Sequence, residues 1–179
     1  MIHLMRGEEK AFLKAHYNLL TSIADRETLT WTEHFFGGSP HSIDGVNWFL
    51  MDTRSMLYLE KGDTLELLAG IPRTYLEDGK RIDLEKVVSY FGPFSLHVES
   101  KASSDRIRAS VEFSTDRRPK RIELRLPHPQ GRKALWVKGG TYDPQTERVA
   151  IEPFNGRAEV TLGFDQRKAD ADFSKPDKR

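Results

Sequence analysis

The hydrophobic pattern of the chain changes its period once. From Glu8 to Ala24 apolar residues recur at helical spacing with no glycine or proline among them, which predicts a helix. A glycine-rich loop follows, and a second helix is predicted from Ser42 or Asp44, either of which can cap it, to about Arg54. The apolar sides of these helices are formed by Phe12, Leu13, Leu19, Leu20, Ile23, Val46, Trp48, Phe49 and Leu50.

From Ser55 onward apolar and polar residues alternate, as they do along strands whose two faces meet different surroundings. The first such strand is expected from Met56 to Glu60, and the clearest alternation lies at 94–99, 106–113 and 121–126. Turn residues separate these runs at short, nearly regular intervals, which is typical of a β-sandwich. The sequence therefore predicts a mainly β fold: an antiparallel β-sandwich with a short N-terminal α-helical segment.

The same pattern divides the 179 residues into three segments. Residues 1–54 are the helical segment, and residues 55–165 are the β-sandwich domain. Residues 166–179 are charged and contain proline, so we expect a disordered tail there.

The stretch from Thr64 to Ser100 combines a strand, a Gly-Ile-Pro-Arg corner, a Phe-Gly-Pro-Phe turn and a second strand. It resembles the region of six-hairpin (α/α)6 glycosidase-like proteins where the helical barrel is followed by a C-terminal β-sandwich. The resemblance implies that residues 1–54 correspond to the last helical hairpin of the barrel. It also implies that most of the catalytic site belongs to barrel hairpins that this chain lacks. The residues that carry the resemblance are Gly70, Ile71, Pro72, Arg73, Leu76, Gly79, Lys80, Phe91, Gly92 and Ser95.

The resemblance implies a role in carbohydrate metabolism. The expected function is that of the C-terminal ancillary part of a glycoside-hydrolase-like protein, inactive when isolated. The alternative is a self-standing β-sandwich module that binds a glycan or takes part in assembly. An exposed planar strip formed by Trp136, Tyr142 and Phe154 would favour this alternative.

The loop from Trp31 to His41 holds the candidate substrate-binding residues. Sugar sites use aromatic faces to stack on pyranose rings, and carboxylates and imidazoles to bind hydroxyls. The candidates are Trp31, Glu33, His34, Phe35 and His41. The resemblance implies that this region faces the cleft of the barrel. The alternative is that Trp31 and Phe35 fill the junction between helices and sandwich, while Glu33 and His34 make local hydrogen bonds.

Glu33 is the candidate catalytic residue. Glycoside hydrolysis needs a second carboxyl group about 5–10 Å away, and Asp44 and Asp52 are the candidates for it. Arg73 is expected to pair with a carboxylate or with carbonyl groups at a domain junction rather than to bind substrate.

No metal or cofactor is expected. His34 and His41 could share a metal, but no HExxH or similar spacing occurs, and the chain has no cysteine. His16 is interpreted as a packed histidine rather than a ligand. A glycine-rich phosphate loop is also missing.

The charge balance argues against nucleic acid or an anionic membrane as partner, because 28 Lys and Arg face 27 Asp and Glu. The basic run at 117–121 continues into alternating apolar positions and is interpreted as the solvated face of a hairpin. The first ten residues are too short and polar for a signal peptide, and no apolar run reaches about 20 residues, so the localisation stays open. Carbohydrate is the candidate ligand. The apolar helix residues predict a homodimer, or docking to a helical barrel partner through the N-terminal helices.

Overall fold

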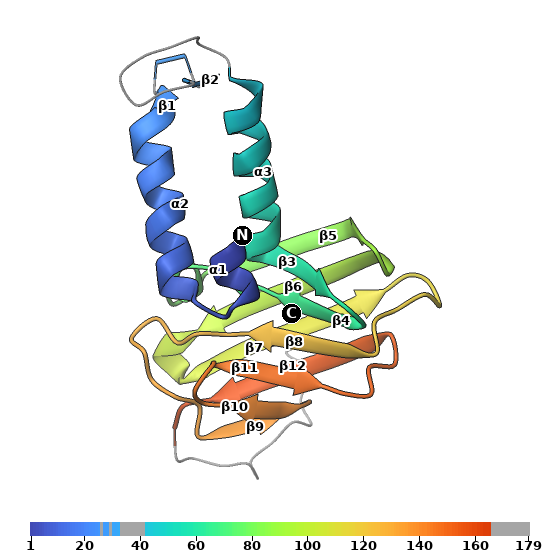
Figure 1. The fold of residues 1–179 in the computed structure, drawn as a ribbon. Coiled ribbons are helices and arrows are strands. Elements are labelled where there is room, and N and C mark those ends of the chain that lie inside the picture. The colour runs from blue at the N-terminus through green and yellow to red at the C-terminus, as the bar shows by residue number, and fades with distance from the viewer. Residues whose placement is uncertain (26, 29, 33–41, 166–179) are drawn as a thin grey trace.

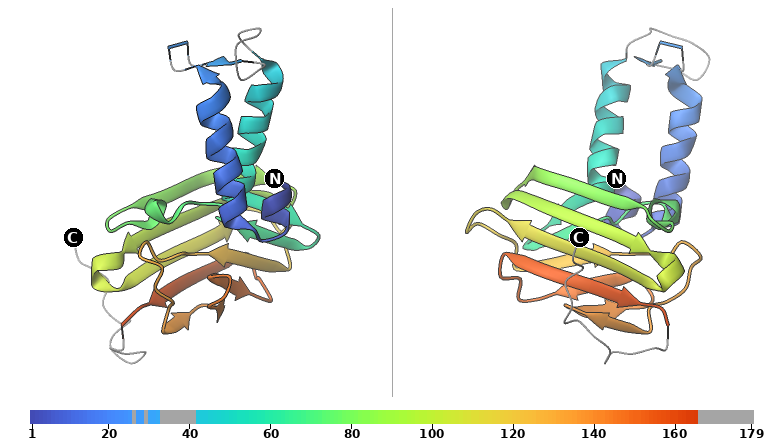
Figure 2. Two further views of the ribbon diagram at one scale, coloured as in Figure 1. Left: turned by 60° about the vertical axis from the view of Figure 1, so that its left-hand side comes forward. Right: turned by 180° about the vertical axis from the view of Figure 1, so that it is seen from behind.

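The computed structural model describes residues 1–25, 27–28, 30–32 and 42–165. A helical hairpin stands on a β-sandwich of two sheets (Figure 1). The helical part consists of α1 (Ile2–Met5), α2 (Glu9–Ile23) and α3 (Ile43–Leu57). At the end of the hairpin far from the sheets, β1 (Ala24–Asp25) pairs with β2 (Thr30–Trp31), as both views in Figure 2 show.

The sandwich has two five-stranded sheets. The first sheet has the order β10 (Thr141–Asp143), β11 (Arg148–Ile151), β8 (Arg121–Arg125), β4 (Thr64–Leu67) and β3 (Tyr58–Lys61). The second sheet has the order β5 (Arg81–Ser89), β6 (Gly92–Lys101), β7 (Arg106–Phe113), β12 (Arg157–Gly163) and β9 (Trp136–Lys138). Two short 3-10 turns, η1 (Arg73–Leu76) and η2 (Ala102–Ser104), lie in the connections. Within the described strands one pair is parallel, β4 with β8, because β5 to β7 cross to the other sheet between them.

The core lies between the two sheets and follows the predicted alternation. Phe94, Leu96 and Val98 on β6 are at most 2% exposed, while Ser95, His97 and Glu99 point to the other side. Leu65, Ile122, Leu124 and Val149 of the first sheet belong to the same buried cluster. The predicted fold class, a mainly β sandwich with an N-terminal helical segment, is confirmed.

Four local features differ from the sequence-based expectation. Helix α3 ends at Leu57 rather than near Arg54, because Met56 lies on the buried side of the helix and is 5% exposed. The first strand of the sandwich accordingly begins at Tyr58, not at Met56. Strand β5 and helix α1 were not predicted; a bulge between Leu84 and Val87 interrupts the alternation of β5.

The start of α3 shows which of the two expected caps is used. The Ser42 hydroxyl accepts a hydrogen bond from the Gly45 N–H at 3.3 Å, so Ser42 is the N-cap. Asp44 lies in the first turn of the helix. Among the residues that the structure describes, no helix has both the length and the apolar character needed to span a membrane.

Gly70 marks the place where the helical part meets the sandwich. Leu4, Phe12 and Met56 from the three helices join the core cluster of the sandwich. A Cβ atom at Gly70 would lie 2.9 Å from Leu4 and 3.0 Å from Phe12, so a larger residue would push the helices away. The Gly-Ile-Pro-Arg corner is therefore part of this junction.

Candidate functional site

The candidate residue Trp31 lies at the far end of the hairpin (Figure 1). Its ring packs on Phe49 with centroids 5.2 Å apart, and it is 8% exposed. Gly45 makes room for it, since a Cβ there would lie 2.9 Å from the Cβ of Trp31. A stacking platform for a sugar needs an open ring face, so this burial argues against such a role. Trp31 does not fill the junction with the sandwich either, because Leu4, Phe12 and Met56 do.

The other candidates of this loop are Glu33, His34, Phe35 and His41. They lie outside the residues that the structure describes. The possible second carboxylates are both described. Asp44 is in the first turn of α3, and Asp52 accepts a hydrogen bond from the Met1 ammonium at 3.1 Å. Asp52 therefore helps to fasten α1 to α3.

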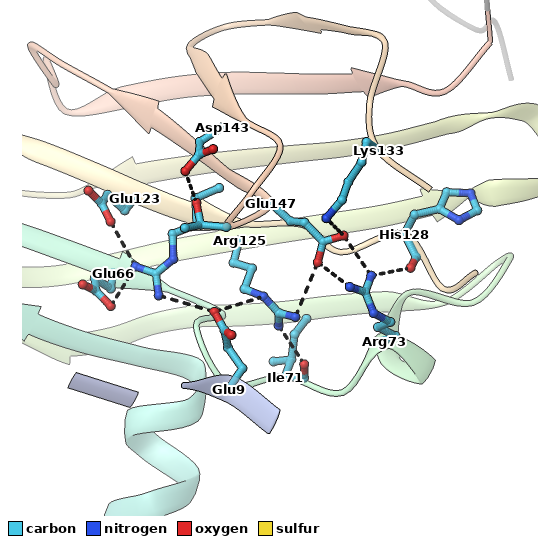
Figure 3. A network of polar contacts seen from close by, with 12 residues as sticks. Glu9, Glu66, Ile71, Arg73, Glu123, Arg125, His128, Lys133, Asp143 and Glu147 are labelled. Carbon is cyan, nitrogen blue, oxygen red and sulfur yellow. Dashed lines mark hydrogen bonds and ion pairs between the residues drawn. The ribbon is translucent and has the colours of Figure 1, made fainter. Parts of the chain in front are cut away.

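A network of ion pairs lies where the N-terminal end of α2 meets the first sheet, as Figure 3 shows. Arg73, at the start of η1, donates to both carboxylate oxygens of Glu147 at 3.0 and 2.5 Å and to the His128 carbonyl oxygen at 2.9 Å. The expected role of Arg73 as partner of a carboxylate and a carbonyl is confirmed.

Glu147 is held by more than this one partner. Lys133 lies 3.1 Å from its carboxylate, and the side chain of Glu147 is 5% exposed. Burial raises the pKa of Glu147, but the hydrogen bonds from Arg73 and Lys133 outweigh it, so the net pKa lies below the usual carboxyl range. Its backbone has φ of +58°, which is uncommon outside glycine, and these contacts hold it there.

Arg125, at the end of β8, connects Glu147 to the helices. Its guanidinium donates to the Ile71 carbonyl oxygen at 3.0 Å. It lies 3.8 Å from the Glu147 carboxylate and 3.9 Å from that of Glu9, in the first turn of α2. Burial lowers the pKa of Arg125, and the two carboxylates counter this effect.

Arg148, on β11, forms the second half of the network. Its guanidinium lies 3.1 Å from Glu66 and 3.0 Å from Glu123, and 4.0 Å from Glu9. Burial lowers the pKa of Arg148, but the surrounding carboxylates outweigh it and the net pKa is raised. Glu9 therefore lies between the buried guanidinium of Arg125 and the largely buried one of Arg148, and joins α2 to the outer face of the first sheet (Figure 3).

This arrangement fits a structural connection better than acid–base catalysis. A glycosidase acid needs a carboxyl group whose pKa is raised, so that it keeps its proton at the working pH. Each carboxylate of the network, on Glu9, Glu66, Glu123 and Glu147, has an arginine within 4.0 Å. In Glu147 such partners lower the pKa, which is the opposite of what a glycosidase acid needs.

The histidines show no metal site in the described part of the chain, where no cluster of three potential ligands occurs. His16 is buried and stacks between Phe12 and Phe49 at 5.6 and 6.0 Å, as expected for a packed histidine. Burial lowers its pKa. His97 pairs with Asp83 at 2.9 Å.

The strip of aromatic residues that would favour the glycan-binding alternative does not form. Phe154 is 4% exposed and belongs to the core, next to Phe113. Trp136 and Tyr142 lie in different sheets. The basic run at 117–121 is partly neutralised, since Lys120 pairs with Asp63 at 2.6 Å and Arg121 with Glu152 at 2.9 Å.

The network of Figure 3 was largely missed from the sequence; only Arg73 was singled out. Glu66 and Arg125 occupy outward positions on strands, where charged residues usually meet solvent. The available signal was their position near the Gly-Ile-Pro-Arg corner. Glu66 lies on the strand that leads into the corner, and Arg125 lies on β8, which pairs with that strand, and donates to Ile71 in the corner. No protein-family model matches this chain, and no curated protein matches it either.

Proposed function

We propose that this chain is the C-terminal ancillary part of a glycoside-hydrolase-like protein, in which the sandwich holds its helical hairpin against a larger helical body. The chain does no chemistry by itself. The observation that carries this proposal is the apolar outer face of α3. The resemblance of residues 64–100 to six-hairpin glycosidase-like proteins points to the class of partner.

The outer face of α3 carries large apolar side chains that nothing in the described chain covers. Ile43 is 75% and Leu50 57% exposed, and Val46 lies between them at the spacing of one helical stripe. Met51 and Trp48 extend this stripe around the helix and are also exposed. Exposed apolar surface that is contiguous in this way marks interaction sites in soluble proteins.

The stripe continues onto the edge of the sandwich. Arg54, one turn beyond Leu50, lies over the ring of Tyr58 at 4.4 Å, and the Tyr58 hydroxyl donates to the Val88 carbonyl oxygen at 3.3 Å. Val88, near the end of β5, is 67% exposed, and Tyr90, in the turn between β5 and β6, is 73% exposed. The surface therefore consists of the apolar face of α3 and, at its end, the exposed side chains of Val88 and Tyr90.

A helical partner fits this shape. The 15 residues of α3 span roughly 22 Å, and their stripe offers the ridge that a second helix needs for close packing. A helix lying along α3 would meet Val88 and Tyr90 with its end. We therefore assign the surface to a helical body with a complementary apolar stripe, as the last hairpin of an (α/α)6 barrel would require.

Sedimentation of the isolated chain tests this proposal. Without the helical body, the apolar stripe should cause self-association at micromolar concentration. Leu50→Glu should yield a monomer, because a buried, unpaired carboxylate opposes the contact. Asn18→Glu, on the exposed side of α2, is the matched control and should not change the mass. A wild-type chain that sediments as a monomer, or an oligomer unchanged by Leu50→Glu, would contradict the docking surface.

A screen against aryl glycosides and oligosaccharides tests the lack of chemistry. We expect turnover no higher than the uncatalysed background, since a cleft built by many helices is not completed by two. Turnover that Glu33→Gln abolishes would overturn this part of the proposal.

The second candidate function is a self-standing glycan-binding module. It requires a binding surface on the sandwich itself, because Trp31 is buried. The polar outer face of the second sheet is the surface that favours it.

A further inference from the structure

The outer face of the second sheet carries a diagonal line of short side chains. Ser95 lies on β6, Ser110 on β7 and Thr161 on β12. Ser110 pairs across the sheet with His97, two residues beyond Ser95, and Thr161 pairs with Arg108, two residues from Ser110. Each step along the line therefore moves one strand sideways and two residues along the strand, which is roughly 8 Å.

The next position on this diagonal is occupied by Trp136. It lies on the edge strand β9, opposite Gly163, which is two residues beyond Thr161. A Cβ atom at Gly163 would lie 1.8 Å from the indole ring, so the ring lies directly on the backbone of β12. The line thus leads from hydroxyl-bearing residues to an aromatic ring.

Longer side chains stand on both sides of the short ones and make a groove. His97 and Arg108 flank the line on one side, and Glu112 and Glu159 flank it on the other. The hollow over the middle of the line has a volume of about 410 Å³, which is within the range of ligand sites. The side chains that line it include Asp83, His97, Arg108, Ser110, Glu159 and Thr161.

The chemistry of the groove fits a neutral ligand with many hydroxyl groups. The side chains of Arg108, Ser110 and Thr161 make no hydrogen bond or ion pair to another described residue. One wall carries the basic side chains of His97 and Arg108, and the other carries the carboxylates of Glu112 and Glu159. Behind the first wall, Arg81 lies 3.2 Å from Glu99 and His97 lies 2.9 Å from Asp83. A polyanion would meet the carboxylates, and an apolar ligand would leave the donors and acceptors unpaired.

We propose that this groove binds a neutral oligosaccharide. The sugar chain runs along the diagonal from Ser95 to Trp136, its hydroxyl groups bind Ser110, Thr161 and Arg108, and one ring stacks on the indole. The site is separate from the apolar face of α3, so it stands whether or not that face docks onto a helical body.

The test is calorimetric titration of the full chain with cellohexaose, xylohexaose and mannohexaose, together with an oligogalacturonate hexamer as the anionic comparison. At least one neutral hexasaccharide should bind, and its amide chemical-shift changes should centre on β6, β7 and β12. Tighter binding of the oligogalacturonate than of every neutral sugar would overturn the assignment of a neutral ligand. Shift changes confined to the helical hairpin, or no binding of any neutral hexasaccharide, would overturn the site.

Two substitutions locate the binding. Ser110→Arg fills the floor of the groove and should abolish binding, whereas Ser114→Arg, on the exposed loop after β7, should leave it unchanged. Arg108→Ala should weaken binding at least tenfold, with Arg117→Ala as the matched control. These positions are on the outer side of the sandwich or in a loop, so the fold is retained. Binding that survives Ser110→Arg would contradict the proposal. Leu50→Glu should not change sugar binding, which keeps this test apart from that of the docking surface.

Discussion

The sandwich and the helical hairpin differ in how far their apolar side chains are exposed to solvent. In the sandwich, Phe94, Leu96 and Leu124 are at most 1% exposed between the sheets. In the hairpin, Ile43 and Leu50 of α3 are more than half exposed, although they form a regular stripe. An apolar helix face that meets solvent adds no stability from burial to the isolated chain.

The hairpin is instead held by packing at its two ends and by one stacking contact between them. Leu4, Phe12 and Met56 close the end near the sandwich, and Trp31 on Phe49 closes the far end. Between them His16 stacks on Phe49. The sandwich therefore supplies most of the stability of the fold, while the middle of the hairpin is open to contact with a partner.

The largest expected effect comes from the core of the sandwich. Phe94→Ala should lower the free energy of unfolding by about 3–5 kcal/mol, because it leaves a cavity between the sheets. Leu50→Ala on α3 should change it by no more than about 0.5 kcal/mol at concentrations low enough to keep the chain monomeric, since the side chain is then in water. Urea unfolding of both variants measures the difference. Equal losses would contradict the exposure of the α3 stripe, because they would mean that Leu50 is buried in the monomer.

Arg73→Ala should have the next largest effect. Removing one partner of a buried ion pair costs about 3–5 kcal/mol, and the partial exposure of Arg73 reduces this to about 2–3 kcal/mol. Replacing both residues, as Arg73→Met with Glu147→Met, should cost less than Arg73→Ala, since the buried carboxylate is removed together with its arginine. Of its other partners, Lys133 is half exposed and Arg125 keeps Glu9. If the single substitution is neutral, the network does not join the corner to the sandwich.

The same pair predicts a dependence on pH. The pKa of Glu147 is lower in the folded chain than in the unfolded one. Its contribution to stability is therefore complete above the ordinary carboxyl pKa of about 4.3 and is lost as the pH falls through the folded-state value. Arg73→Ala should weaken this acid dependence. Urea unfolding at neutral pH and at about pH 3 measures it.

His16→Phe should have a smaller, local effect within the hairpin. Burial lowers the pKa of His16, partly offset by Asp52, so folding favours the neutral ring. The stability from this residue is present above the ordinary histidine pKa of about 6.5 and declines as the pH falls below it. The protection factors of α2 amides against hydrogen exchange should therefore fall on acidification in the wild type and not in His16→Phe. Identical profiles in both proteins would show that His16 does not sense pH.

The smallest effect is expected from an exposed ion pair on the second sheet. Arg81 is 69% exposed and lies 3.2 Å from Glu99. Arg81→Ala should change the free energy of unfolding by at most about 1 kcal/mol, and less at high salt. Thermal unfolding at two salt concentrations checks this. A larger loss would show that the outer face contributes to the fold rather than being free for a ligand.

Much of the fold could be predicted from the sequence. The alternation at 94–98 and 106–113 is a local property, and it appears in the structure as buried and outward positions on β6 and β7. The helical period from Glu8 to Ala24 likewise gave α2 within one residue at each end. Strand β5 was missed because its bulge breaks the period on which such a prediction depends.

The candidate sites could be predicted much less well. Trp31 and Phe154 were singled out for their residue type, but both are buried, and burial depends on which elements meet. Arg73 was interpreted correctly as a junction residue, although its partner Glu147 is 74 positions away in the chain. A partner this far along the sequence cannot be recognised from the residues around Arg73.

The order of helices and strands, the inward side of most strands and the position of the corner at Gly70 can be predicted from the sequence, because they follow from local periodicity and steric limits. Three other features become visible only in the folded chain. Glu9 lies between Arg125 and Arg148, the apolar side of α3 points outward, and one diagonal joins Ser95, Ser110, Thr161 and Trp136. These depend on strand register and on how distant elements come together. Both are set by the total burial and pairing of the whole chain rather than by any one segment.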